Sequence, residues 1–247
     1  MSPGTIGPGC RSLFYGGSPQ RTTVHCLFPD SYRVGLRWWL GLPLLKEDLT
    51  HPVSCPGCLV QVDCFGDHLL CCPRNNYTRR HQAVQEAIVS VVSEAAQPFA
   101  REVPIPDCPE GQLRPADILL KGWQTGTDVA VDLTVVHAWR QAEQASTATA
   151  VTRERWRSSL SKAERQKRDK YNRPCSEAGW AFLPMAFGTW GGMGPEAAKL
   201  LHRLLGRAAS WLEGPLRGRR QEELQQHVGV ALMRQVWHLL DAKNLLQ

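Results

Sequence analysis

Two apolar segments in the middle of the chain each hold an acidic residue in their interior, among β-forming side chains. Leu113–Lys121 and Asp128–His137 are separated by a short segment with turn glycines, so together they predict a β-hairpin. The acids inside them are Asp117 and Asp132. Burying an ionised carboxylate is costly unless it is paired or binds a metal, and two carboxylates on adjacent strands also repel each other. A divalent cation such as Mg²⁺, which takes carboxylate oxygens as ligands, relieves both costs. The alternative is that each acid pairs with an arginine of a basic segment further along the chain.

The cysteines are concentrated in a second short segment. Five of the nine lie between Cys55 and Cys72, and an odd total cannot be fully paired within one chain. In a reducing compartment such clustering indicates a metal site rather than disulfides. Cys55-Pro-Gly-Cys58 is a tight turn whose two thiolates can bind one zinc ion, and His68 with Cys72 completes a four-ligand structural site. On spacing alone, Cys71 is as good a fourth ligand as Cys72, and the alternative to zinc is that the thiols pack as small apolar groups.

The charge of the chain lies in a third segment. Between Arg153 and Arg173 there are nine Lys or Arg and three Asp or Glu, so this segment carries +6, which equals the net charge of the whole chain. One basic element on a neutral body indicates a site for a polyanion, of which nucleic acid is the leading candidate. The alternative is a solvated helix face.

The composition excludes several classes of protein. With 43% hydrophobic and 21% charged residues, the chain is globular rather than disordered. The longest stretch without charge, residues 178–195, contains five glycines and two prolines, which a membrane-spanning helix does not tolerate. The first residues lack the pattern of a secretory signal, so we expect a nuclear or cytoplasmic protein that is not secreted and has no membrane partner.

Hydrophobic periodicity predicts the remaining elements. A short strand is expected at residues 101–106, and another at 180–187, where Pro184 places it at a sheet edge or a bulge. Helices are expected at residues 31–45, 77–96, 139–171, 195–212 and 222–246.

The motifs, taken in order, resemble the PD-(D/E)xK nuclease core. More closely, they resemble the restriction-like endonuclease domain at the C-terminus of early-branching, site-specific non-LTR retrotransposons. In that family a CCHC knuckle precedes an Arg-His motif, an Arg/Lys-Pro-Asp strand, a second acid and a helix with a Lys-x-x-Lys-Tyr signature. The chain supplies, in the same order, Cys55/Cys58/His68/Cys72, Arg80-His81, Arg114-Pro115-x-Asp117, Asp132 and Lys167-Arg168-Asp169-Lys170-Tyr171.

The resemblance implies an α/β (α+β) fold with a restriction-endonuclease-like core. The core is a small central mixed sheet flanked by helices, with an N-terminal zinc knuckle and C-terminal helices. It also favours Cys72 over Cys71 as the fourth zinc ligand. We therefore expect an N-terminal extension with one helix (1–50), a CCHC zinc knuckle (51–76), the nuclease core (77–195) and a C-terminal helical extension (196–247).

The function implied by the resemblance is Mg²⁺-dependent DNA nicking. Asp117 and Asp132 would bind Mg²⁺, and Lys170 or Lys167 would replace the lysine that the standard core carries at the position of Thr134. The residues expected at nucleic acid are Arg80, His81, Arg114, Arg165 and Arg168. The partner is DNA, with RNA of the element as a further candidate. The alternative is an inactive, zinc-containing DNA- or RNA-binding module derived from such a nuclease.

Overall fold

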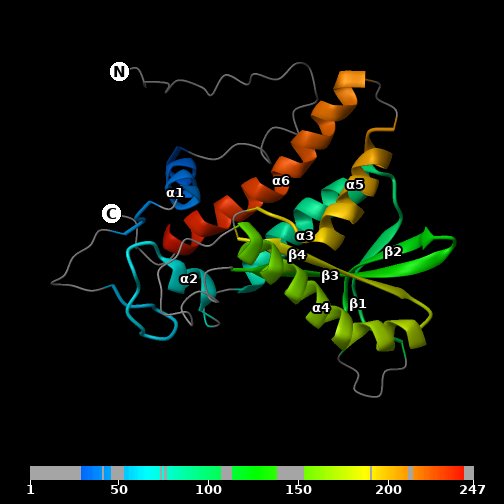
Figure 1. Ribbon diagram of the computed structural model, residues 1–247, viewed down its shortest axis with the longest axis horizontal. Helices are drawn as coiled ribbons and strands as arrows, with labels where there is room; N and C mark the ends of the chain where they lie inside the picture. Colours follow the sequence, from blue (N-terminus) through cyan, green and yellow to red (C-terminus); the bar gives the residue numbers. More distant parts are fainter. Residues whose placement is uncertain are drawn as a thin grey trace, which may run out of the picture.

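The computed structural model describes residues 29–40, 42–45, 53–72, 74, 77–106, 113–137, 153–189, 191–210 and 214–241. The elements in these ranges, drawn in Figure 1, are α1 (Pro29–Trp39), α2 (Asp67–Cys71), α3 (Tyr77–Glu94), β1 (Phe99–Val103), β2 (Ala116–Gln124), β3 (Thr127–Val136), α4 (Arg153–Glu177), β4 (Ala181–Gly188), α5 (Pro195–Ala208) and α6 (Gly214–Asp241).

The predicted hairpin is confirmed as β2 and β3. The two strands are antiparallel and Gln124 pairs with Thr127, which leaves a two-residue turn. Both turn residues have positive φ, 46° at Thr125 and 87° at Gly126. A type I′ turn requires this conformation, and its twist matches that of the strands it joins.

The hairpin forms the centre of a mixed four-stranded sheet. The strand order is β1-β2-β3-β4, with β1 antiparallel to β2 and β4 parallel to β3. A parallel pair needs a crossover, and α4 lies in the crossover between β3 and β4. The strand β4 is an edge strand, as the proline in its sequence predicts: Pro184 pairs with Asp132, and its missing N–H is tolerated at an edge.

Helices cover both faces of this sheet (Figure 1). The helices α3 and α5 pack on one face, where they form the larger apolar core with β2, β3 and β4; its fully buried members include Ile88, Ile118, Met185, Phe187 and Leu204. The helix α4 packs on the opposite face, against a smaller core that contains Leu119, Ala130, Cys175 and Phe182. Strand alternation places Asp132 on the same face as Ala130, and therefore towards α4.

A buried carboxylate fixes α4 against the start of α5. Glu164 is 4% exposed and accepts hydrogen bonds from the main-chain N–H groups of Glu196 and Ala197 in the first turn of α5. Burial raises the pKa of Glu164, although these N–H groups act in the opposite direction. A Cβ atom on Gly194 would lie 2.1 Å from Oε1 of Glu164, so any larger residue there would displace this carboxylate. This contact sets the position and rotation of α4 one turn before Lys167.

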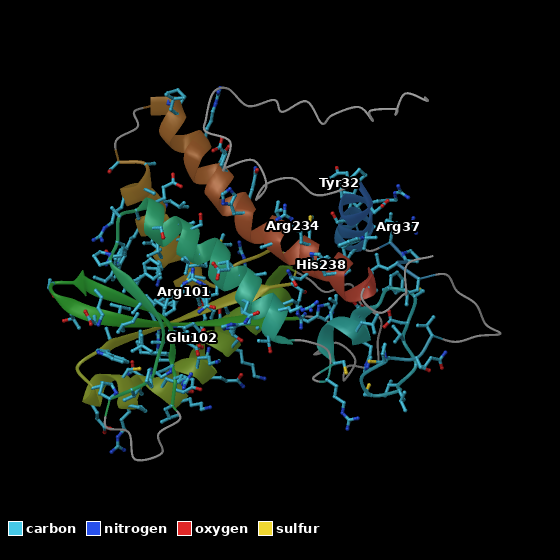
Figure 2. All side chains as sticks on the ribbon, turned by 180° about the vertical axis from the view of Figure 1, so that it is seen from behind. Tyr32, Arg37, Arg101, Glu102, Arg234 and His238 are labelled. Carbon is cyan, nitrogen blue, oxygen red and sulfur yellow. The ribbon has the colours of Figure 1, made fainter. Side chains whose placement is uncertain are left out.

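A second apolar core joins three segments that are far apart in the sequence. It contains Trp38 of α1, the cysteine-rich segment around Cys55 and Cys72, and Val236 and Leu240 near the end of α6. Figure 1 shows α6 running from α5 across to α1 and α2. Figure 2 shows the same crossing from behind, with Tyr32 and Arg37 of α1 beside Arg234 and His238 of α6. The long helix α6 therefore connects the cysteine-rich segment to the helices of the sheet.

Several details differ from the sequence-based expectations. The helix α1 ends at Trp39 rather than at residue 45, because Pro43 cannot continue it, β1 spans Phe99–Val103 rather than residues 101–106, and α6 begins at Gly214 rather than at residue 222. The helix α4 continues past Pro174 to Glu177, because a proline near the end of a helix removes only one hydrogen bond of the last turns. The short helix α2 was not predicted. Residues 138–152, expected to begin the long helix, and residues 1–28 lie outside the described residues. Among the helices that are described, none is both long and apolar enough to cross a membrane.

Candidate functional site

Asp117 and Asp132 come together where the β2–β3 ladder ends. Ile118 lies opposite Val131, and continuing this register by one residue puts Asp117 opposite Asp132. At this point the main-chain N–H of Leu133 on β3 donates to a side chain of β2, Oδ2 of Asp117, at 2.5 Å. Asp117 is 8% exposed and Asp132 is 4% exposed. The structure thus places the two acids side by side and largely out of water.

Lys167 pairs with the more deeply buried acid. Its Nζ atom lies 2.9 Å from Oδ2 and 3.1 Å from Oδ1 of Asp132. Burial raises the pKa of Asp132 to about 6, although the charge and hydrogen bond of Lys167 lower it. One lysine therefore only partly offsets the cost of keeping this carboxylate ionised in the protein.

The two candidate lysines occupy different faces of α4. The side of α4 that faces the protein is formed by Leu160, Glu164, Lys167, Tyr171 and Cys175, which recur at helical spacing and are buried or partly buried. Lys170 lies off this stripe and is exposed, with its Nζ atom 4.8 Å from the centroid of the Tyr171 ring. Of the two, Lys167 is therefore the lysine that reaches the acids.

His81 contacts the other acid from α3. Its Nε2 atom lies 2.9 Å from Oδ2 of Asp117, the oxygen that also accepts the N–H of Leu133. The hydrogen bond to Asp117 raises the pKa of His81, and burial opposes this rise. His81 was a candidate for contact with DNA or with the active site, and the structure places it at the carboxylate pair. Its neighbour Arg80 is 7% exposed, so its side chain is buried rather than on the surface of the protein.

The other predicted basic residues are on the surface. Arg165 and Arg168 of α4 and Arg114 just before β2 are exposed, and Arg168 also lies 3.5 Å from Glu196. Exposed cations thus occur on α4 and beside β2, the two elements that supply Lys167 and Asp117.

The four predicted zinc ligands converge. Cys55, Cys58, His68 and Cys72 each offer one ligand atom, and these atoms all lie within 4.8 Å of one another. Three thiolates and one imidazole in this arrangement could hold a zinc ion. The Sγ atom of Cys58 lies 3.0 Å from Nε2 of His68. Although burial opposes ionisation, the N–H groups of Cys58 and Gly57 lower the pKa of the Cys55 thiol to about 6, which favours the thiolate that zinc requires.

Sequence reasoning missed three residues that support these two sites. His137, at the end of β3, contacts Oγ1 of Thr189 through Nδ1 at 2.8 Å and Oδ1 of Asp67 through Nε2 at 3.3 Å. Asp67 precedes the predicted zinc ligand His68, so this contact links the cysteine-rich segment to the sheet. Gln85 is a buried amide on α3 whose contacts reach Asp117. Its spacing of four residues from His81 is the only sequence signal that indicates its place.

No protein-family model matches the chain, and a search of curated proteins finds no match either. The functional interpretation therefore depends on the geometry of the site and on the order of the motifs.

The first prediction concerns the zinc site. Cys58→Ala should lower zinc content and thermal stability together, because such a site does not exist in the unfolded chain and metal binding is coupled to folding. Cys64, which is outside the four-residue group, provides the control, and Cys64→Ala should retain zinc. Metal analysis and thermal denaturation of both variants measure this. Purified wild-type protein that holds less than half an equivalent of zinc and is as stable as Cys58→Ala would contradict the prediction.

The second prediction concerns pH. A carboxyl whose pKa is raised in the folded state stabilises the protein at low pH, and this stability is lost as the pH rises. Asp132 should therefore lower the free energy of unfolding of the metal-free protein as the pH rises from about 4 to 6. Above pH 6 the free energy of unfolding stays at this lower level. Asp132→Asn, whose amide oxygen can still accept from Lys167, should therefore stabilise the metal-free protein at pH 7.5 by roughly 1–3 kcal/mol and much less at pH 4.5.

Asp128 on the same strand is the matched control. Hydrogen bonds from Lys121 and the N–H of Gly122 lower its pKa, so the sign is reversed and Asp128→Asn should slightly destabilise the protein at pH 7.5. Denaturant unfolding at the two pH values measures both variants. A loss of stability in Asp132→Asn at pH 7.5 would contradict the account of this carboxylate.

Proposed function

We propose that the chain is a Mg²⁺-dependent DNA endonuclease of the restriction-like type found in site-specific non-LTR retrotransposons. The observation that carries this proposal is the pair of buried acids, Asp117 and Asp132, opposite each other on adjacent strands with Lys167 on Asp132. Two carboxylates on a mixed sheet and a lysine on the helix that follows are also what the order of motifs in the sequence predicts.

The donor set suits magnesium. Mg²⁺ takes oxygen ligands, commonly from one or two carboxylates, and keeps several waters. Burial raises the pKa of Asp132 to about 6, so this site favours added positive charge. When bound, the ion would polarise the scissile phosphate and lower the pKa of a bound water.

The side chains around the acids have complementary roles in this proposal. Lys167 is partly buried beside Asp132, where its charge can stabilise the negative charge that develops on the phosphate in the transition state. His81 and the N–H of Leu133 hold one oxygen of Asp117 and leave the other to face the cation. Lys170 is exposed on α4, as are Arg165 and Arg168, so these residues suit contacts to backbone phosphates.

A second candidate function is a nucleic-acid-binding module without catalysis. The observation in its favour is that the acids already have partners within the protein: Lys167 for Asp132, and His81 for Asp117. A nuclease that has lost its metal could keep this arrangement together with its zinc site and basic helix. The two candidates differ in whether a cation displaces these internal partners.

Plasmid nicking separates the two candidates. Asp132→Ala should reduce Mg²⁺-dependent nicking of supercoiled plasmid at least about a hundredfold, while DNA affinity stays within a few-fold because phosphate contacts dominate it. Lys167→Ala should lose about a hundredfold in cleavage rate, the cost typical of one electrostatic group at a reacting centre. Lys170→Ala, three residues away, should mainly weaken binding and reduce its salt dependence.

The outcomes are distinct. Cleavage that survives Asp132→Ala contradicts the two-carboxylate site. Equal losses of cleavage in Lys167→Ala and Lys170→Ala, with unchanged DNA affinity, contradict the separate roles assigned to these lysines. A wild-type protein that binds DNA but never cuts it with Mg²⁺ or Mn²⁺ supports the binding module instead.

A further inference from the structure

A buried glutamine on α3 contacts two of the strands that carry acidic residues. Gln85 is 5% exposed, and its Nε2 atom donates to the main-chain carbonyl oxygen of Asp117 at 2.9 Å and to Oε1 of Glu102 at 2.7 Å. Both partners are acceptors only, so the amide nitrogen must face them, because a flipped amide would set oxygen against oxygen. Gln85 therefore has one orientation, and Glu102 helps to fix it.

The two residues that Gln85 contacts, Glu102 and Asp117, lie opposite each other on adjacent strands. In the β1–β2 pair, Arg101 is opposite Ile118 and Val103 is opposite Ala116, so Glu102 is opposite Asp117. Glu102 has a φ of 50°, a conformation that costs energy for any residue except glycine and persists only where the surroundings enforce it. Figure 2 shows Arg101 and Glu102 together beside α3. The contact with Gln85 helps to hold Glu102 in this conformation.

Asp117 is consequently held at two points from the same helix. His81 binds its carboxylate and Gln85, one turn later on α3, binds its carbonyl oxygen. The free oxygen of the carboxylate can point in a defined direction only if the main chain at this residue is also fixed. The N–H of Leu133 donates to the side chain of Asp117, so β3 holds the carboxylate at this point while Gln85 holds the main chain.

We infer that Gln85 is a positioning residue for Asp117, held in its working orientation by Glu102. This inference rests on the proposed function, in which Asp117 binds the catalytic cation. Gln85 touches neither the cation nor the substrate. It acts by fixing the main chain from which the carboxylate is presented.

The chain offers a matched control for a purely structural role. Gln97 is 7% exposed, and its Nε2 atom donates to a carbonyl oxygen of the same strand, that of Lys121, at 2.7 Å. Both glutamines are therefore buried amides bonded to the main chain of β2. They differ in that the β2 partner of Gln97, Lys121, lies four residues beyond Asp117 and away from the acids, and in that Oε1 of Gln97 also accepts from Arg207.

The test compares Gln85→Leu with Gln97→Leu in the full chain loaded with zinc. Both variants should lose thermal stability, since each leaves a carbonyl oxygen of β2 without its side-chain donor and Gln97→Leu also removes the acceptor of Arg207. Only Gln85→Leu should raise the Mn²⁺ concentration for half-maximal plasmid nicking, by about tenfold, as expected when an outer partner of a metal ligand is lost. It should also shift the NMR signal of the Leu133 amide and speed its hydrogen exchange, because that N–H donates to Asp117. In Gln97→Leu both readouts should stay within twofold of wild type.

Each result decides the inference. Equal effects of the two variants on Mn²⁺ response and on the Leu133 amide overturn it. If Gln85→Leu does not fold, Glu102→Ala, a change at an exposed side chain, should shift the Leu133 amide signal in the same direction, and an unchanged signal overturns the inference. If the wild-type protein cuts DNA with neither metal, the proposed function fails, and the Leu133 amide alone still tests whether Gln85 positions Asp117.

Discussion

Two buried carboxylates on adjacent strands are the constraint on which the rest of this structure depends. Asp117 and Asp132 face each other at the end of the β2–β3 ladder, in a place where neither is well solvated. Like charges so placed destabilise a fold unless other groups compensate them. The surrounding elements supply that compensation: α4 contributes Lys167, and α3 contributes His81. The helices on the two faces of the sheet thus have an electrostatic role besides packing.

The cysteine-rich segment belongs to a separate apolar core but is not independent of the sheet. Its core is shared with α1 and the end of α6, which in turn contacts α3 and α5. His137 adds a direct polar link, because it extends from the end of β3 to Asp67, beside His68 of the four-residue group that could hold zinc. If that group binds zinc, loss of the ion should disturb His137, five positions after Asp132. The cysteine-rich segment is thus physically connected to the strand that carries Asp132.

Local patterns in the sequence predicted the elements that depend on local physics. The hairpin follows from β-forming runs and a Thr-Gly turn, and the zinc ligands follow from the spacing of cysteine and histidine. The choice between Lys167 and Lys170 was left open, because it depends on the rotation of α4 about its axis. That rotation is set by buried contacts far along the chain, above all those of Glu164 with the first turn of α5. The helical stripe that includes Leu160, Glu164 and Lys167 was a usable signal for it.

Gln85 and His137 could not be predicted in the same way. A glutamine in an amphipathic helix is ordinarily solvated, and its partners Asp117 and Glu102 are brought to it only by the packing of α3 on β1 and β2 and by the register of these two strands. The same holds for the contact of His137 with Asp67, which joins residues 70 positions apart. Contacts of this kind depend on tertiary structure and leave no periodic signal in the chain.

The central claim is that Asp117 and Asp132 form a site for a divalent cation. The most direct measurement is a titration of the zinc-loaded, isotopically labelled protein with Mn²⁺, which broadens the NMR signals of amides close to where it binds. We expect the amides of Asp117, Ile118, Asp132 and Leu133 to broaden first, and Asp132→Ala to remove this effect while the fold is retained. Broadening that begins elsewhere and leaves these four amides unchanged would contradict the claim.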